Sequence, residues 1–265
     1  MQFHFALLIL SFIILGSIFA PYIATHNPFE PNMHVRLQGP SWQHYFGTDA
    51  LGRDMFSRIL FGGRASMLLS LISSSLALSL GVMMGILSGY YGGKVDGFLT
   101  IITSIFQGIP SSCFMIAIAG IFGASIYSLV LALVITSWAG FSRIVRSQVM
   151  QLVREPFVDG LRCLGCSDFR LLWRHILPNL AHKLMVLFTI RLGRGVLAVA
   201  GLSFLGLGAQ PPSPEWGAML SAGRDYLTTA PYITYFPGLA IMLTVLAFNL
   251  LGDGLRDALD PKVKD

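Results

Sequence analysis

The sequence predicts an all-α membrane protein that crosses the bilayer six times. Of its 265 residues, 54% are apolar and only 12% are charged, whereas a soluble domain carries about 25% charged residues. Six apolar stretches are long enough to cross the bilayer as helices. Nine of the 18 Lys and Arg residues lie between Arg143 and Arg194, which indicates a cytoplasmic loop, because positive residues are retained on that side. Six crossings then leave both termini in the cytoplasm.

The first apolar stretch, residues 3–24, is predicted to be a transmembrane helix rather than a signal peptide. No Lys or Arg precedes it, its apolar run is too long, and Ile18 with Pro21 does not fit a cleavage site. Residues 25–62 are polar and rich in Pro, Asn and His, so we expect a loop outside the membrane.

Two features of this loop bear on its structure and chemistry. Thr48 or Asp49 is predicted to cap a helix that begins within the loop. Three histidines stand at spacings of eight and ten residues, which place no two of them on one helix face. We interpret them as solvated loop residues rather than as metal ligands. They are His26, His34 and His44.

The second span, residues 64–90, carries a ridge of small residues at every fourth position. Residues four apart lie on the same helix face, and small side chains let membrane helices approach closely. The small-residue ridge is therefore predicted to pack against another helix rather than to bind a ligand. It consists of Ser73, Ala77, Gly81, Gly85 and Gly89.

The third and fourth spans are predicted at residues 95–122 and 125–149. Pro110 lies inside the third span and is expected to kink it, because proline cannot donate the backbone hydrogen bond of a helix. Such a kink either borders a passage between the helices or serves packing alone, and both interpretations stay open. Cys113, in the same span, is predicted to be buried.

The fifth and sixth spans are predicted at residues 183–208 and 233–251. Arg191 and Arg194 are expected to lie in the cytoplasmic extension of the fifth span or to snorkel. For Asn249, in the sixth span, we favour an interhelical hydrogen bond over contact with a ligand or a place on a passage between the helices. The proline-rich connection between these spans returns outside, where Glu215, Trp216 and Gly217 are expected to begin a short helix.

The polar, basic stretch between the fourth and fifth spans, residues 157–179, is predicted to form two short amphipathic helices. Apolar residues recur there at helical spacings, and Gly165 marks a turn. Pro178 is expected to end the second helix before the fifth span. Such helices suit the docking of a soluble partner. Cys163 and Cys166 are interpreted as small packing residues, because a lone C-x-x-C in a cytoplasmic loop indicates neither a disulfide nor a metal site.

This stretch resembles the cytoplasmic coupling loop of ABC importer permeases, in which a Glu-Ala-Ala triplet precedes a Gly and an Ile-x-Leu-Pro element. Asp159 stands at the Glu, Gly165 at the Gly, and Leu177–Pro178 at the Leu-Pro. Three more stretches resemble the dipeptide, oligopeptide and nickel branch of these permeases: Phe46–Arg58, Gly201–Gly208 and Ala247–Pro261.

The resemblance implies the transmembrane domain of a type I ABC importer, with a cytoplasmic coupling helix, in the bacterial inner membrane. It implies that two separate ATPase subunits bind and hydrolyse ATP and that this chain needs no cofactor or metal. The implied partners are a homologous but different permease subunit and an extracytoplasmic substrate-binding protein; nucleic acid is not among them. The residues implied in coupling to the ATPase are Asp159, Gly160, Leu161, Arg162, Gly165, Leu177 and Pro178.

We accordingly divide the chain into three parts. Residues 1–62 hold the first helix and the extracytoplasmic loop, residues 63–252 the transmembrane core with the coupling loop at 155–179, and residues 253–265 a cytoplasmic tail. Permeases of this branch transport nickel, dipeptides or oligopeptides. The short N-terminus and the tail motif are closer to the nickel members, so we favour nickel, free or chelated, over peptides.

A stand-alone carrier or channel is the alternative. Such proteins place ionisable residues inside their spans, and the predicted spans hold almost none away from their ends. An intramembrane enzyme is a further hypothesis that the sequence disfavours, because Ser203 is followed by Phe204 rather than by the Gly of a Gly-x-Ser-Gly site, and H-E-x-x-H is absent. The turn at residues 90–96 lacks the spacing of a phosphate-binding loop.

Overall fold

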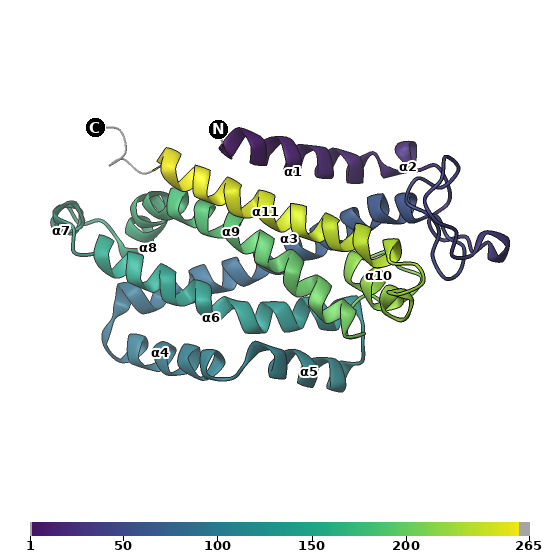
Figure 1. Cartoon of the computed structure of the whole chain (residues 1–265). Helices are drawn as coiled ribbons and strands as arrows, with labels where there is room; N and C mark the ends of the chain where they lie inside the picture. The colour runs from purple at the N-terminus through teal and green to yellow at the C-terminus, as the bar shows by residue number, and fades with distance from the viewer. Residues whose placement is uncertain (1, 260–265) are drawn as a thin grey trace.

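The computed structural model describes residues 2–259, which form a bundle of helices running mostly along one direction (Figure 1). Short 3-10 turns occur at Met33–Val35 and Arg224–Tyr226, and a π-helical turn at Leu172–Ile176. The helices are α1 Gln2–Ile18, α2 Ala20–Ile23, α3 Met55–Tyr91, α4 Gly93–Gly108, α5 Ser111–Phe122, α6 Ile126–Leu152, α7 Pro156–Cys163, α8 Asp168–Leu171, α9 Leu177–Phe204, α10 Trp216–Gly223 and α11 Tyr232–Leu259.

The predicted all-α membrane class is confirmed, although the spans differ in length. Four helical stretches are long and apolar enough to cross a membrane: residues 55–91, 126–152, 168–204 and 232–259. α4 and α5 together give a fifth span that is bent by 86°. The first predicted span corresponds to α1, which is apolar but shorter. α3 packs along α6 and also contacts α1, α4, α9, α10 and α11, so it organises the bundle.

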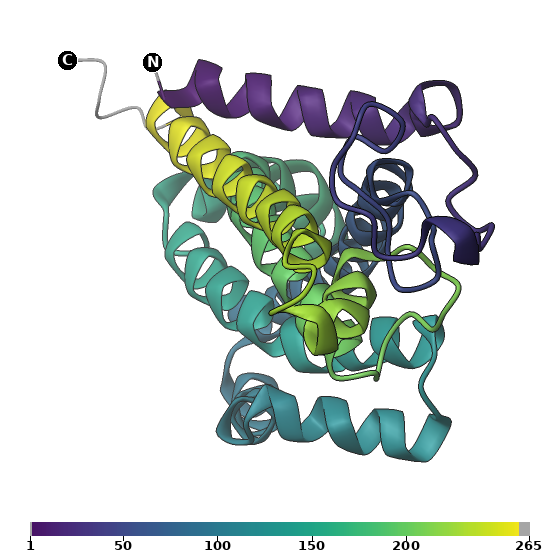
Figure 2. The ribbon, with the colours of Figure 1, turned by 45° about the vertical axis from the view of Figure 1, so that its right-hand side comes forward.

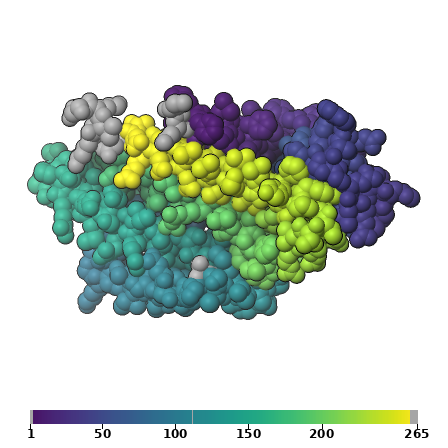
Figure 3. Space-filling model, viewed as in Figure 1, coloured from purple at the N-terminus to yellow at the C-terminus, as the bar shows by residue number. Residues whose placement is uncertain are grey.

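The bundle has two distinct ends. α7 and α8 lie at one end, which we call the coupling end, together with the start of α1 and the end of α11 (Figure 1). The loop at residues 24–54 and α10 project from the opposite end, the loop end (Figure 3). The predicted tail begins inside α11, which continues to Leu259, and its residues 260–265 lie outside the described residues.

Two prolines interrupt predicted spans more sharply than expected. α1 stops at Ile18, and Pro21 falls in the first turn of α2, where its missing N–H breaks no helical bond. α4 stops at Gly108, and α5 begins after Pro110. Ile109 is extended, because the residue before a proline avoids helical backbone angles. The predicted kink is therefore a break, and Figure 2 shows α4 nearly end-on while α5 lies across the view.

Pro178 does not end a helix, contrary to the prediction. Helical backbone runs without a gap from Asp168 to Phe204. The π-helical turn precedes the proline, with the Leu177 N–H donating to the carbonyl of Leu172, and Pro178 then lies in the first turn of α9. The wider π-helical turn accommodates Pro178, whose ring and missing N–H would break a regular α-helix at this point. α8 and α9 therefore form one continuous helical stretch.

The loop end is held together by buried charges. The N-cap of α3 is Asp54, whose carboxylate accepts from the Ser57 N–H at 2.8 Å, rather than the predicted Thr48 or Asp49. Asp49 instead accepts from the Arg53 Nε at 2.7 Å and lies 3.6 Å from the Arg58 Nε. All four of these charged side chains are buried. Oppositely charged side chains are thus buried together at the start of α3. Burying any one of them without its partner would be strongly destabilising.

Candidate functional site

The predicted coupling loop forms α7, a tight turn and α8. Gly165 has φ +74°, and its N–H donates to the Arg162 carbonyl at 2.9 Å while the Cys166 N–H donates to the Leu161 carbonyl at 3.0 Å. This pair of bonds is the glycine-dependent C-cap called a Schellman motif. An added Cβ at Gly165 would meet open space, so within this chain the glycine is required by its backbone angle rather than by close packing.

One side of the coupling loop is anchored in the bundle. Val158 of α7 and Leu171 of α8 are fully buried. They belong to one apolar cluster with Val145 and Val149 of α6. Partly buried residues of α3, including Ile86, pack against the same cluster. Because packed side chains move together, a displacement of α7 or α8 is transmitted to α3 and α6.

The other side of the coupling loop exposes large apolar side chains. Leu164 is 84% exposed, Phe169 is 77% exposed and Trp173 is 67% exposed. Asp159 and Arg162 of α7 form a solvent-exposed ion pair 3.5 Å apart, and Phe169 and Trp173 also line a groove with residues of α3 such as Met83. An exposed apolar patch with a charged rim is typical of a protein docking surface. We call the five residues Asp159, Arg162, Leu164, Phe169 and Trp173 the coupling surface.

The predicted coupling residues are only partly brought together. Asp159, Gly160, Leu161 and Arg162 share α7 with the turn at Gly165, whereas Leu177 and Pro178 begin α9. Tyr90, at the end of α3, was not predicted. Its hydroxyl donates to Asp168 at 2.5 Å, and the guanidinium of Arg162 lies 5.7 Å from its ring centroid. Tyr90 therefore contacts both sides of the turn, a long-range relation that sequence spacing does not reveal.

The small-residue ridge of α3 faces α6. A Cβ at Gly81 would lie 2.4 Å from Phe141, one at Gly85 2.6 Å from Val145, and one at Gly89 2.8 Å from Val149. Ala77 is fully buried, and Ser73 is buried where the ridge approaches α9. The placement fits the predicted packing role, and the role itself stays a prediction.

Replacing Gly85 with leucine is expected to destabilise the protein by several kcal/mol, because the added side chain meets both the Ser142 carbonyl and Val145 and overpacking costs about 1–3 kcal/mol even where side chains can move. The midpoint of thermal unfolding in detergent measures the effect. Gly97→Leu in α4 is the matched control, since nothing lies within 4 Å of a Cβ there. Equal losses in the two variants would contradict the packing role.

A polar cavity of about 210 Å³ lies between α3, α5, α6 and α9. Arg191 and Arg194 line it, and whether they lie in a cytoplasmic extension of the span or snorkel stays a prediction. α9 begins at Leu177, several residues before the predicted start, and both arginines therefore fall well inside the helix. The Arg191 guanidinium lies 5.0 Å from the ring centroid of Phe141. A helix that is long and apolar enough to cross a membrane therefore carries two arginines well inside it, which weakens the sequence argument against a carrier.

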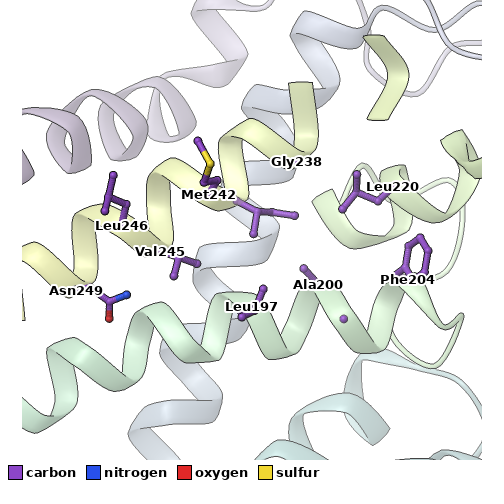
Figure 4. Close-up of a pocket in the computed structure, with 11 residues that line it drawn as sticks. Leu197, Ala200, Phe204, Leu220, Gly238, Met242, Val245, Leu246 and Asn249 are labelled. Atoms are coloured by element: carbon purple, nitrogen blue, oxygen red, sulfur yellow. The ribbon is translucent and has the colours of Figure 1, made fainter. Parts of the chain in front are cut away.

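A larger, mostly apolar groove of about 700 Å³ runs between α9, α10 and α11 (Figure 4). Leu197, Met242 and Asn249 are among its lining residues, and Figure 4 shows Asn249 on α11 facing α9. Pro110 is exposed and lines neither this groove nor the polar cavity.

Cys113 and Cys163 are exposed, so the predicted burial of Cys113 is wrong. Its helix, α5, packs only one face against α6.

The histidines of the loop end are not all solvated. His44 is only 7% exposed and its Nδ1 lies 2.9 Å from Asp54. The ring centroid of His26 lies 4.5 Å from that of His44, with the two rings tilted by 34°, and the His26 Nδ1 is 3.8 Å from Asp54. These three residues are close enough to share a metal ion. However, the Asp54 carboxylate already caps α3 and accepts from the Ser57 hydroxyl at 2.7 Å, which accounts for its position without a metal.

Comparison with known proteins places this arrangement among transporters. A family model described as "Binding-protein-dependent transport system inner membrane component" matches residues 81–265. The "Glutathione transport system permease protein GsiD" of Shigella flexneri serotype 5b (strain 8401) is 46% identical over 260 residues, which cover 98% of this chain and 86% of that protein. The protein of the same name from Escherichia coli O6:K15:H31 is 44% identical over 260 residues, which again cover 98% of this chain and 86% of that protein.

A solved structure shares the fold. It is titled "Inward facing conformations of the MetNI methionine ABC transporter: CY5 native crystal form". The match has a TM-score of 0.59 and covers 74% of this chain and 93% of the other, at 17% sequence identity.

Proposed function

Because the chain belongs to the family of binding-protein-dependent transport system inner membrane components, we propose that it forms half of the translocation pathway of an ATP-driven importer of small peptides. The chain is a type I ABC importer permease of the peptide and nickel branch. Such a permease works with a second permease, an ATPase and a binding protein. The observation that carries our proposal is the coupling surface, whose exposed apolar side chains sit on helices anchored to α3 and α6.

The proposed mechanism is mechanical. An ATPase subunit grips α7 and α8 through the coupling surface, with the Asp159–Arg162 pair at its rim. Closure of two ATPase subunits moves the coupling loop, and the buried contacts of Val158 and Leu171 pass the movement to α3 and α6. The continuous helix from Asp168 to Phe204 passes it to α9. The spans then alternate between access to the two sides.

We place the coupling end, with both termini, in the cytoplasm. The cluster of Lys and Arg between Arg143 and Arg194 supports this orientation. A homologous but different permease then faces this chain across the pathway. The apolar groove between α9 and α11 is open and offers such a partner a place to pack.

For the substrate we propose a small peptide, with glutathione as the first candidate. The relatives at 44% and 46% identity carry glutathione in their names, and glutathione is a tripeptide. These names lend no support to the nickel preference drawn from the sequence. A stand-alone carrier is not favoured, since membership of this family implies a separate energy source.

We expect uptake of labelled glutathione or dipeptide to disappear in cells that lack only this subunit and to return when the chain is supplied. Labelled nickel should not follow the same pattern. Purified chain alone in liposomes should transport neither substrate, because the energy comes from the ATPase subunits. Uptake by the chain alone, without ATP, would instead establish a carrier.

A further inference from the structure

Two arginines lie well inside the long apolar helix α9 without acidic partners among the residues that the structure describes. Arg194 stands ten residues before Phe204, the last residue of α9, and Arg191 thirteen. At 1.5 Å per residue they lie roughly 15 and 20 Å from that end of the helix. Neither arginine takes part in any ion pair formed by residues 2–259. Such residues are costly unless they face a polar cavity or a ligand.

The bundle is built to hold both arginines at the polar cavity. Gly195 lies between the two on α9, and a Cβ there would come within 2.4 Å of the Ser70 hydroxyl and 3.0 Å of the Ser74 hydroxyl. The glycine thus lets α3 approach α9, and the Ser70 hydroxyl donates to the Leu192 carbonyl at 2.9 Å. On the other side, the Arg191 guanidinium packs on Gly140 and over Phe141 of α6.

The cavity also holds an unsatisfied hydroxyl. Ser73 lines it together with Arg191 and Arg194. Its side chain is only 3% exposed, and its Oγ has no hydrogen-bond partner among the described residues. Buried hydroxyls are nearly always paired. An unpaired donor beside two unpaired cations therefore indicates a missing acceptor with negative charge.

We propose that Arg191, Arg194 and Ser73 form a binding site for a carboxylate of the peptide cargo. This inference rests on the proposed function. The two guanidinium groups donate charge-assisted hydrogen bonds to the carboxylate oxygens, and Ser73 donates a third bond. Arg194 is exposed at the cavity and Arg191 is half-buried, so an arriving carboxylate meets Arg194 first.

Size and charge restrict what the site accepts. A volume of about 210 Å³ corresponds to roughly seven water molecules at about 30 Å³ each, which admits one end of a peptide rather than a whole peptide. Two positive charges repel a free divalent cation. The site therefore favours a peptide or another anionic cargo over free nickel.

The test compares a peptide that has a free C-terminal carboxylate with its C-terminal amide. The complete importer, with both permeases, ATPases and binding protein, is reconstituted in proteoliposomes, and the uptake of both peptides is measured. Arg191→Gln and Arg194→Gln are each expected to lower uptake of the acid about tenfold or more, since a hydrogen bond to a charged group contributes about 1.5–3 kcal/mol. Uptake of the amide should change little, and Arg194→Lys should restore part of the acid uptake.

The ratio of acid to amide uptake separates this role from others. The same binding protein serves every variant, so its own preference cancels in the comparison. Arg143→Gln is the matched control, because Arg143 is an exposed arginine of α6 that does not line the cavity, and it should leave the ratio unchanged. An equal fall for acid and amide would show that the arginines pair with the partner permease instead, and no fall would show that they do not meet cargo. Failure of the unaltered importer to take up either peptide would overturn the proposed function itself.

Discussion

Replacing Leu164 or Phe169 with aspartate is expected to abolish ATP-driven uptake while the chain still folds and inserts. Both side chains are largely exposed at the coupling end, so the substitutions remove little packing within the chain. In a complex, an apolar anchor at the centre of an interface contributes about 2 kcal/mol or more. A buried carboxylate in its place adds a desolvation cost. A loss of at least 30-fold in affinity for the ATPase follows, as about 1.4 kcal/mol corresponds to tenfold.

Co-purification of the ATPase subunits with the tagged permease measures this loss directly. Trp42→Asp is the matched control, because Trp42 is also a large, almost fully exposed apolar side chain but lies in the loop at residues 24–54, at the opposite end of the bundle. We expect the Trp42 variant to retain the ATPase. If the Leu164 and Phe169 variants also retain it at the unaltered level, the coupling surface does not bind the ATPase.

Gly165 is among the residues implied in coupling, but it is poorly suited to a test of docking. Its positive φ and its place in the C-cap of α7 mean that any side chain strains the turn itself. Loss of transport in a Gly165 variant would then report on the shape of the coupling loop as well as on docking. Substitutions of the exposed residues Leu164 and Phe169 test docking without straining the turn.

Local sequence patterns predicted the features that depend on one helix at a time. The small-residue ridge from Ser73 to Gly89, with a small residue at every fourth position, lies on the face of α3 that meets α6 and α9. Helical periodicity alone determines that face. The helix start at Glu215 is also correct: its carboxylate accepts from the N–H groups of Gly217 and Ala218 at 3.0 and 2.9 Å. An acidic residue that follows a proline is a local signal for such a start.

Features that depend on contacts between distant segments were missed. The start of α9 was placed late, because Pro178 was interpreted as a stop and the π-helical turn that admits it has no clear sequence signal. With the earlier start, Arg191 and Arg194 lie well inside α9 rather than near its beginning. The solvated interpretation of His44 failed for a similar reason, since its burial results from Asp54, ten residues away at the start of α3. Spacing within a loop does not report which distant group a side chain meets.

Replacing Asp49 with alanine is expected to prevent stable folding of the loop end and to remove most of the protein from the membrane. The carboxylate of Asp49 accepts from the N–H groups of Leu51 and Arg53 and pairs with Arg53 and Arg58. Both arginines are buried, so its removal leaves two like charges in a site of low polarity. Removing one partner of a buried ion pair typically lowers the free energy of unfolding by about 3–5 kcal/mol. This is a large part of the total stability of a typical domain.

The amount of folded protein after mild detergent extraction, and its thermal midpoint, measure this effect. Asp225→Ala is the matched control, since Asp225 pairs with Arg224 at 3.5 Å but both side chains are well exposed, and exposed pairs contribute little. Asp49→Asn distinguishes charge from shape, because asparagine keeps an acceptor oxygen for the turn but not the negative charge. If Asp49→Asn is as stable as the unaltered protein, hydrogen bonding rather than charge pairing holds the loop end together. If Asp49→Ala is equally stable, the buried charges are compensated by groups other than Asp49.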